Sequence, residues 1–127
     1  MSIEALDIIR KALVDELKLH YEFGTWSKKG IYPYWVGEYQ DIPPMNEDGM
    51  QETTFILTGF TRGKWLELVK AKEAIEKHFN KIHGKTVIAE SGSAVAVFYS
   101  DSFNIPTGDA ELKKIQINLD VKEWKVN

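Results

Sequence analysis

Few side chains in this sequence have the types and the spacing that enzyme catalysis requires. The histidines His20, His78 and His83 include no pair four residues apart, the spacing that presents two metal ligands on one helix face. The serines between residues 91 and 102 lack the Gly-x-Ser-x-Gly context of a nucleophile elbow. The chain contains no cysteine, which excludes a thiolate nucleophile and thiolate metal ligands. The sequence therefore predicts a protein that is not an enzyme.

Two segments match ligand-binding loops only in part. Residues 59–64 contain the glycines and the lysine of a phosphate-binding loop, but the spacing is one residue too short and Trp65 replaces the serine or threonine. Residues 44–55 place Asn, Asp and Gly at the third, fifth and sixth positions of an EF-hand calcium loop. Its first and last positions are Pro44 and Phe55, which cannot supply a carboxylate. We therefore expect no bound metal and no cofactor.

The basic side chains Lys70, Lys77 and Lys81 fall on one side of a predicted helix. They could contact phosphate, but Glu73 lies four residues before Lys77, in the orientation that favours an intrahelical ion pair. The net charge of -3 also argues against nucleic acid as the main partner, because lysine and arginine drive phosphate binding. A solvated helix face is therefore favoured over a nucleic-acid site.

Charge is unevenly distributed along the chain. Residues 31–61 carry five acidic side chains and no lysine or arginine, whereas residues 62–85 carry seven basic side chains and three glutamates. One interpretation is chance segregation of charge on two surfaces that both face solvent. The segregation also suits self-association, because an acidic patch and a basic patch on one protomer can meet in a head-to-tail contact that closes a ring. The sequence alone leaves both interpretations open.

Aromatic residues are concentrated between residues 21 and 39. A stacking platform for bases or sugars is one interpretation, but such platforms usually carry positive charge, and the flanking charge here is negative. Packing in the core or in a subunit interface is the better interpretation, since large aromatic side chains dominate burial in both. The seven residues are Tyr21, Phe23, Trp26, Tyr32, Tyr34, Trp35 and Tyr39.

Hydrophobic periodicity predicts two helices and five strands in a single domain over residues 1–127. The expected fold class is α+β, with two helices packed on a largely antiparallel sheet in the order α-β-β-α-β-β-β. Two loops, 40–50 and 101–110, separate strands. The predicted elements are a helix over 3–20, strands over 30–39 and 53–61, a helix after Lys64 that ends at Gly84, strands over 86–90 and 94–101, and a strand from Lys114 onward.

Three positions carry local expectations. Ser2 is the expected cap of the first helix. Pro33 is expected to place its strand at a sheet edge or in a bulge, because proline cannot donate a backbone hydrogen bond. Apolar residues alternate along the last strand until Trp124 and Val126 change phase, which either a bulge near Lys122 or a change of packing partner would explain.

Apolar runs in the sequence are short, and none approaches the roughly 20 residues that a membrane-spanning helix needs. Residues 1–4 lack the basic start and the apolar core of a secretion signal. The protein is therefore expected to be soluble and intracellular, with no membrane partner.

Several segments together resemble a known family. They are the N-terminal helix, residues 31–39 (IYPYWVGEY), the strand 55–60 (FILTGF) that leads into residues 65–79, and the late hairpin followed by residues 114–119 (KIQINL). In element order and length this arrangement is similar to the phage tail terminator proteins, also called tail-to-head joining proteins, of long-tailed siphophages and prophages. The resemblance extends over nearly the whole chain.

This resemblance implies a structural role in virion assembly. Such proteins form hexameric rings that cap the finished tail tube, end its polymerisation and join it to the head connector. The implied partners are further copies of this chain, the major tail tube protein and the head-completion connector protein, with DNA only as passing cargo. The implied location is the host cytoplasm during assembly and then the tail-head junction of the virion.

The candidate interface residues lie in exposed segments of the predicted fold. The acidic first loop is compatible with a lumen or docking surface that DNA passes without sticking. The candidates are Asp41, Glu47 and Asp48 in the first loop, Phe103 and Asp109 in the second, and Lys70, Lys77 and Lys81 on the helix.

Two alternatives to a tail terminator stay open. Another small head-tail joining or minor tail protein would use a similar domain. A host-type small-molecule or peptide-binding α+β module would instead have a pocket lined by Trp26, Tyr34 or Trp35 with convergent polar groups.

Overall fold

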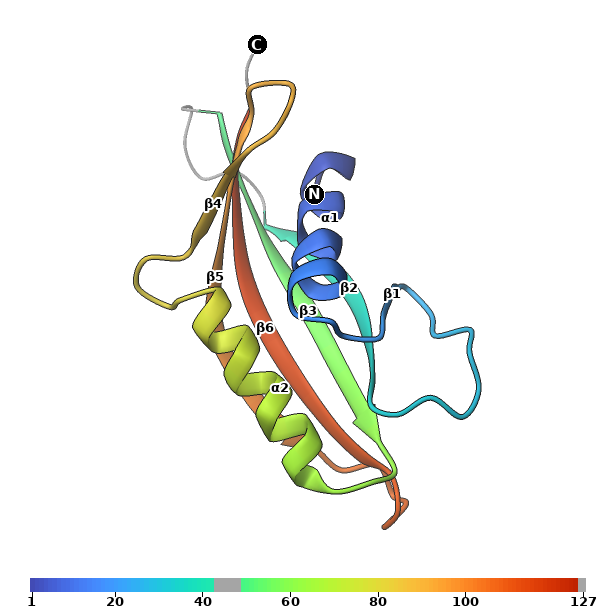
Figure 1. Ribbon diagram of the computed structural model, residues 1–127. Helices are drawn as coiled ribbons and strands as arrows, with labels where there is room; N and C mark the ends of the chain where they lie inside the picture. The colour runs from blue at the N-terminus through green and yellow to red at the C-terminus, as the bar shows by residue number, and fades with distance from the viewer. Residues whose placement is uncertain (43–48, 126–127) are drawn as a thin grey trace.

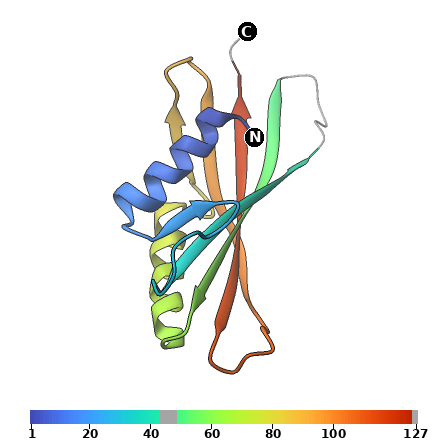
Figure 2. The ribbon, with the colours of Figure 1, turned by 90° about the vertical axis from the view of Figure 1, so that its right-hand side faces the viewer.

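The computed structural model describes residues 1–42 and 49–125. A six-stranded sheet carries the helices on one of its sides and leaves its other side without a helix (Figures 1 and 2). The α+β class is therefore confirmed, and the element order differs from the prediction by one additional strand. The elements are α1 (Ile3–Arg10), its π-helical continuation η1 (Lys11–Glu16), β1 (Tyr21–Phe23), β2 (Tyr34–Ile42), β3 (Met50–Thr61), α2 (Trp65–His78), β4 (Lys85–Ile88), β5 (Ala94–Ile105) and β6 (Lys113–Trp124).

The strands lie in the order β1-β2-β3-β6-β5-β4. β1 runs parallel to β2, and every other neighbouring pair is antiparallel. The three central strands β3, β6 and β5 are twelve residues long each. Because successive side chains of a strand point to opposite sides, half of these side chains face the helices and half face away.

The core lies between the helices and the covered side of the sheet (Figure 2). Among the described residues, Trp35 of β2 is the largest fully buried side chain. The helices contribute apolar stripes, which bury large side chains on one face only. The other fully buried large side chains of the core are Ile9 and Leu13 of the first helix, Leu68 and Ile75 of α2, Phe79 just after it, and Phe55, Leu57, Ile117 and Leu119 of the central strands.

The first helix is shorter than predicted. It begins after the expected cap Ser2, whose hydroxyl oxygen accepts a hydrogen bond of 3.1 Å from the first turn. It widens into η1, where the Leu17 N–H donates to the Ala12 carbonyl, and it ends at Glu16 rather than at residue 20. Lys18 then adopts a φ of 59°, in the left-handed region, which interrupts the helical path.

A short strand that the sequence analysis missed precedes β2. β1 has only three residues and pairs in parallel with β2, with Tyr21 opposite Trp35. β2 begins at Tyr34 rather than at residue 30, and Pro33 lies immediately before it. The expectation that Pro33 marks an edge or a bulge is therefore wrong, since β2 is paired on both sides and the proline takes no part in the ladder.

Helix α2 ends well before Gly84. Its last residue is His78, and the Asn80 side-chain oxygen accepts hydrogen bonds of 2.8 and 3.0 Å from the N–H groups of residues 82 and 83. This local turn offers the backbone donors an alternative to the helix. Lys81 therefore lies in the turn, which corrects the predicted row of three helical lysines.

The last two strands also differ from the prediction. β5 continues to Ile105 through a bulge between Tyr99 and Asp101, so the second loop covers residues 106–112 instead of 101–110. β6 keeps an unbroken register with β3 up to Trp124. Of the two explanations for the phase change, the bulge near Lys122 is therefore wrong.

Candidate assembly surfaces

The side of the sheet without helices is rich in aromatic side chains. We call it the open face, and it comprises the even-numbered residues of β2, β3 and β6 together with Ala94, Ala96, Phe98, Asp101, Phe103 and Ile105 of β5. A sheet face that only meets water is usually polar, whereas aromatic side chains are enriched in protein interfaces. Its aromatic members are Tyr34, Phe60, Phe98, Phe103 and Trp124, and of these Phe103 and Trp124 are exposed.

At one end of the open face the aromatic rings stack on one another. The centroids of the Trp26 and Tyr34 rings are 5.0 Å apart, and those of Tyr34 and Phe60 are 4.9 Å apart. The Lys114 ammonium lies 5.4 Å from the Phe60 centroid, in cation–π contact. Tyr34 and Phe60 therefore pack against neighbouring side chains of the same protomer and are half-buried. This agrees with the interpretation of the aromatic cluster as packing.

Two of the three aromatic side chains named for a small-molecule pocket share one depression. Trp26 and Tyr34 line this open depression of about 370 Å³ beside Glu38 and Lys114. Trp35 is fully buried in the core instead. The depression therefore combines an aromatic wall with one carboxylate and one ammonium group, and the binding module stays an alternative.

Within the described residues, carboxylates outnumber ammonium groups on the open face. Partial burial raises the pKa of the Asp120 carboxyl, and the nearby Glu52 charge raises it further. The fold therefore keeps a carboxylate in a position where its charged form is disfavoured. The four acids and two lysines are Glu38, Glu52, Asp101, Asp120, Lys114 and Lys122.

Replacing Asp120 by asparagine is expected to stabilise the protein at neutral pH. The pKa of Asp120 is higher in the folded protein than in the unfolded chain. The contribution of Asp120 to the free energy of unfolding is therefore fully present below the unfolded pKa of about 4, and it is lost as the pH rises through the folded pKa. Asparagine does not ionise, so the variant gains stability over the wild type only above that range. Urea denaturation from about pH 3 to about pH 8 measures this. A difference that does not change with pH would contradict the assignment, and Glu38→Gln, at an exposed position of the same face, is the control.

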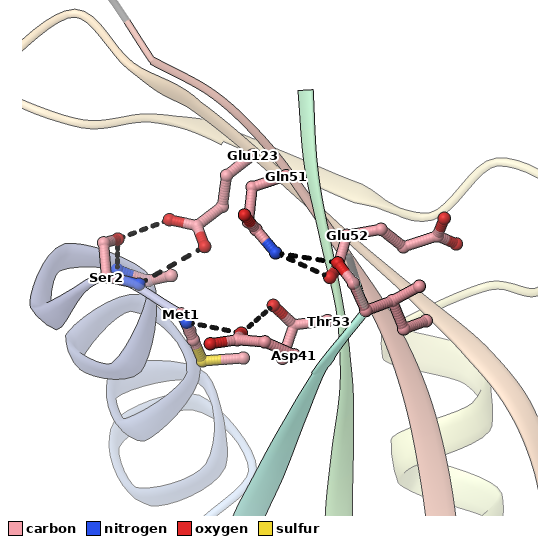
Figure 3. A network of polar contacts seen from close by, with 9 residues as sticks. Met1, Ser2, Asp41, Gln51, Glu52, Thr53 and Glu123 are labelled. Carbon is pink, nitrogen blue, oxygen red and sulfur yellow. Dashed lines mark hydrogen bonds and ion pairs between the residues drawn. The ribbon is translucent and has the colours of Figure 1, made fainter. Parts of the chain in front are cut away.

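A polar network fastens the start of α1 to the sheet (Figure 3). The Ser2 hydroxyl donates to one carboxylate oxygen of Glu123, and the Ser2 backbone N–H lies 3.3 Å from the other oxygen. Glu123 is only 2% exposed. Glu123 lies at a position of β6 that faces the helices, where the alternating pattern would place an apolar residue. A carboxylate at this position makes the apolar pattern of the sequence appear to change phase. The Glu123 carboxylate also lies at the N-terminal end of α1, where the helix dipole favours negative charge.

Asp41 belongs to the same network. Its Oδ1 accepts hydrogen bonds of 2.6 Å from the Met1 amino group and 2.8 Å from the Thr53 hydroxyl (Figure 3). These two donors, the amino group first, hold the pKa of the Asp41 carboxyl below its ordinary value. The charge of Asp41 is thus already balanced within the protomer, and its role in a subunit interface stays a prediction.

The candidates of the second loop lie apart from each other. Phe103 lies on β5 in the open face, not in a loop, because the strand is longer than predicted. Asp109 does lie in the loop, where it accepts a hydrogen bond of 2.9 Å from the Glu111 N–H and lies 3.3 Å from Arg62. The Glu111 N–H, and after it the Arg62 guanidinium, lower the pKa of the Asp109 carboxyl.

The charged candidates do not form one site with Phe103. Lys70 and Lys77 are exposed on α2, on the opposite side of the sheet from the open face. Glu47 and Asp48 lie outside the residues that the structure describes. The structure therefore places the helical lysines on the opposite side of the sheet from the aromatic open face, in a helix that carries three lysines and three glutamates.

Two exposed apolar features on the helical side were not predicted from the sequence. Trp65, Leu66 and Val69 of α2 are exposed, although the helix is amphipathic. Between α1 and β1 lies a groove with exposed Ile3 and Phe23. The exposed apolar side chains of α2 could have been predicted from the sequence, because Leu66 and Val69 fall outside the helical stripe that contains Leu68 and Ile75. The groove was not predictable, because β1 was not.

Neither a metal centre nor a membrane segment is found in the part of the chain that the structure describes. Its acidic and histidine side chains form no group of three or more that could hold a metal ion. None of its helices is long and apolar enough to cross a membrane. No protein-family model matches this chain, and no curated protein matches it significantly.

Proposed function

We propose that this chain is a structural subunit of a phage tail terminator, which forms a ring on the end of the tail tube, stops its growth and joins it to the head connector. It acts by binding and not by catalysis. The observation that carries the proposal is the open face, a side of the sheet on which the described part of the chain places no helix and on which Phe103 and Trp124 are exposed. The helical side stays available for contacts between copies, and head-to-tail contacts between unlike surfaces close into rings. The element order that resembles the tail terminator family also supports it.

The open face is the surface that we assign to the tail tube. Exposed Phe103 and Trp124 offer aromatic anchors, the residue type that most often dominates binding energy in interfaces. The surrounding carboxylates repel nucleic acid, which suits a protein past which DNA moves without sticking. The same face thus suits protein contact and disfavours DNA contact.

The mass in solution tests the ring. Light scattering across protein concentrations is expected to show a ring mass at low salt and a lower mass at high salt, because charge interactions are screened within about 3 Å at 1 M salt and about 10 Å at 0.1 M. A protein that stays monomeric in all conditions and also fails to sediment with assembled tail tubes contradicts the proposal. That result favours the small-molecule or peptide-binding module.

The assignment of the open face is tested by Phe103→Asp. We expect at least about a tenfold loss in co-sedimentation with tubes of the major tail tube protein, since the change places a charge at a hot-spot position. Ile82→Asp, in the exposed turn after α2, is the matched control and is expected to bind normally. Binding to the connector protein but not to the tube favours another head-tail joining protein.

A further inference from the structure

The outward side of α2 carries an apolar ridge that borders solvent in the described protomer. Leu66 is 55% exposed and Val69 is 41% exposed, and Trp65 beside them is also exposed. The inward side of the same helix already supplies the buried residues Leu68 and Ile75. A helix with one solvated side usually carries polar residues there. The ridge is therefore more apolar than the fold of a single protomer requires.

A groove of matching character lies between α1 and β1. It has a volume of about 510 Å³ and is lined by Ile3, Leu6, Tyr21 and Phe23, among others. Ile3 is 86% exposed and Phe23 is 49% exposed, so both side chains border water. Clusters of exposed apolar side chains with polar rims mark interaction sites.

Both surfaces are bordered by side chains of both charge signs. Lys70 and Glu73 are exposed on α2 near the ridge, and the groove is lined by Glu22, Arg10 and Asp7, whose carboxylate lies 3.6 Å from the Arg10 guanidinium. An ammonium and a carboxylate on the helix can thus meet a carboxylate and a guanidinium on the groove. Opposed charges of this kind fix the orientation of partners more than they add affinity.

We infer that α2 of one protomer seats the Leu66–Val69 ridge in the α1–β1 groove of a second copy of this chain. Ridge and groove belong to different elements, so the contact is heterologous: each protomer offers its ridge to one neighbour and its groove to the other. Contacts of this kind close into a ring when the rotation permits. The inference rests on the proposed ring and names the interface that builds it, whereas the open face stays available for the tail tube.

Cross-linking tests this contact directly, because the chain has no cysteine of its own. Leu66→Cys and Phe23→Cys are made in separate full-length chains, mixed, and treated with a short bis-maleimide, with and without tail tubes. We expect a dimer in the mixture and little or none with either variant alone. A chain that carries both changes is expected to give a ladder of cross-linked species that stops at the copy number of the ring.

The controls separate failure of this inference from failure of the proposed function. Ile88→Cys on β4, at the other edge of the sheet and 66% exposed, replaces Phe23→Cys in a parallel mixture and is expected to give no dimer. If ring masses form but the Leu66 and Phe23 variants do not cross-link, the interface lies elsewhere and the proposed ring stands. If no cross-link, ring mass or tube binding is seen, both are overturned.

A second variant tests the energetics of the same contact. Leu66→Glu is expected to weaken ring formation by at least about tenfold, because it places an unpaired charge in an apolar groove. Circular dichroism is expected to stay unchanged, since Leu66 is exposed in the protomer. Ring formation by Leu66→Glu at the wild-type concentration overturns the inference.

Discussion

Replacing Trp35 by alanine is expected to lower the free energy of unfolding by about 3–5 kcal/mol. Trp35 is fully buried, and its removal leaves a cavity that the surrounding core fills only in part. Domains have a total stability of about 5–15 kcal/mol, so this loss is a large fraction. Urea denaturation followed by circular dichroism measures it. Trp124→Ala, at an exposed position of the open face, is the matched control and is expected to change stability by about 0.5 kcal/mol or less.

The close approach of Trp35 to β3 gives a second test of the same packing. A Cβ atom at Gly59 would lie 2.5 Å from Cζ3 of the Trp35 ring, closer than real contacts allow. Gly59→Ala is therefore expected to cost about 1–3 kcal/mol in the wild type. In a Trp35→Leu background the ring is absent and the cost is expected to fall. Purely additive effects of the two changes would contradict this packing.

Strong periodicity predicted the parts of the fold that bury large apolar faces. Ile115, Ile117 and Leu119 alternate without interruption, and they are buried on one side of β6. In α2 the residues Leu68 and Ile75 recur at helical spacing and reach the core. In both elements the local pattern and the tertiary burial agree, which is why the α+β class could be predicted from sequence alone.

The errors occur where distant partners decide the local structure. β1 has three residues, too few for a periodic signal, and exists because β2 offers a free edge to Tyr21 and its neighbours. The end of α2 is set by the Asn80 side chain rather than by Gly84. Helix and strand ends depend on such single hydrogen bonds, which periodicity does not reveal.

The candidate surfaces were less predictable than the fold. Segregated charge along the sequence does not correspond to two sides of the sheet in the described residues, because Asp41 lies on the helix side and α2 carries as many glutamates as lysines. The sequence could not show that Asp41 lies 2.6 Å from the Met1 amino group, or that Asp109 lies 3.3 Å from Arg62. Both are pairings across long sequence separations, and they change which charges a partner meets.

Replacing Glu123 by alanine is expected to lower the free energy of unfolding by about 1.5–3 kcal/mol, the range for hydrogen bonds to a charged group. The buried carboxylate accepts two hydrogen bonds from Ser2 and lies at the N-terminal end of α1. Glu38→Ala removes a carboxylate from an exposed strand position and serves as the matched control. An equal loss in both variants would show that the Glu123 network does not anchor the helix.

The loss is expected to be local, and Ser2 separates its two causes. Amide hydrogen exchange should become faster in α1 of Glu123→Ala while α2 keeps its protection, because the network joins only α1 to the end of the sheet. Ser2→Ala removes both the bond to Glu123 and the cap on the Ala5 N–H, whereas in the Glu123→Ala background it removes only the cap. Ser2→Ala should therefore cost less stability in the Glu123→Ala background than in the wild type. The difference between these two costs measures the coupling between Ser2 and Glu123. Equal costs in both backgrounds would mean that Ser2 acts on the helix alone, and that the burial of Glu123 contributes nothing to holding α1 against the sheet.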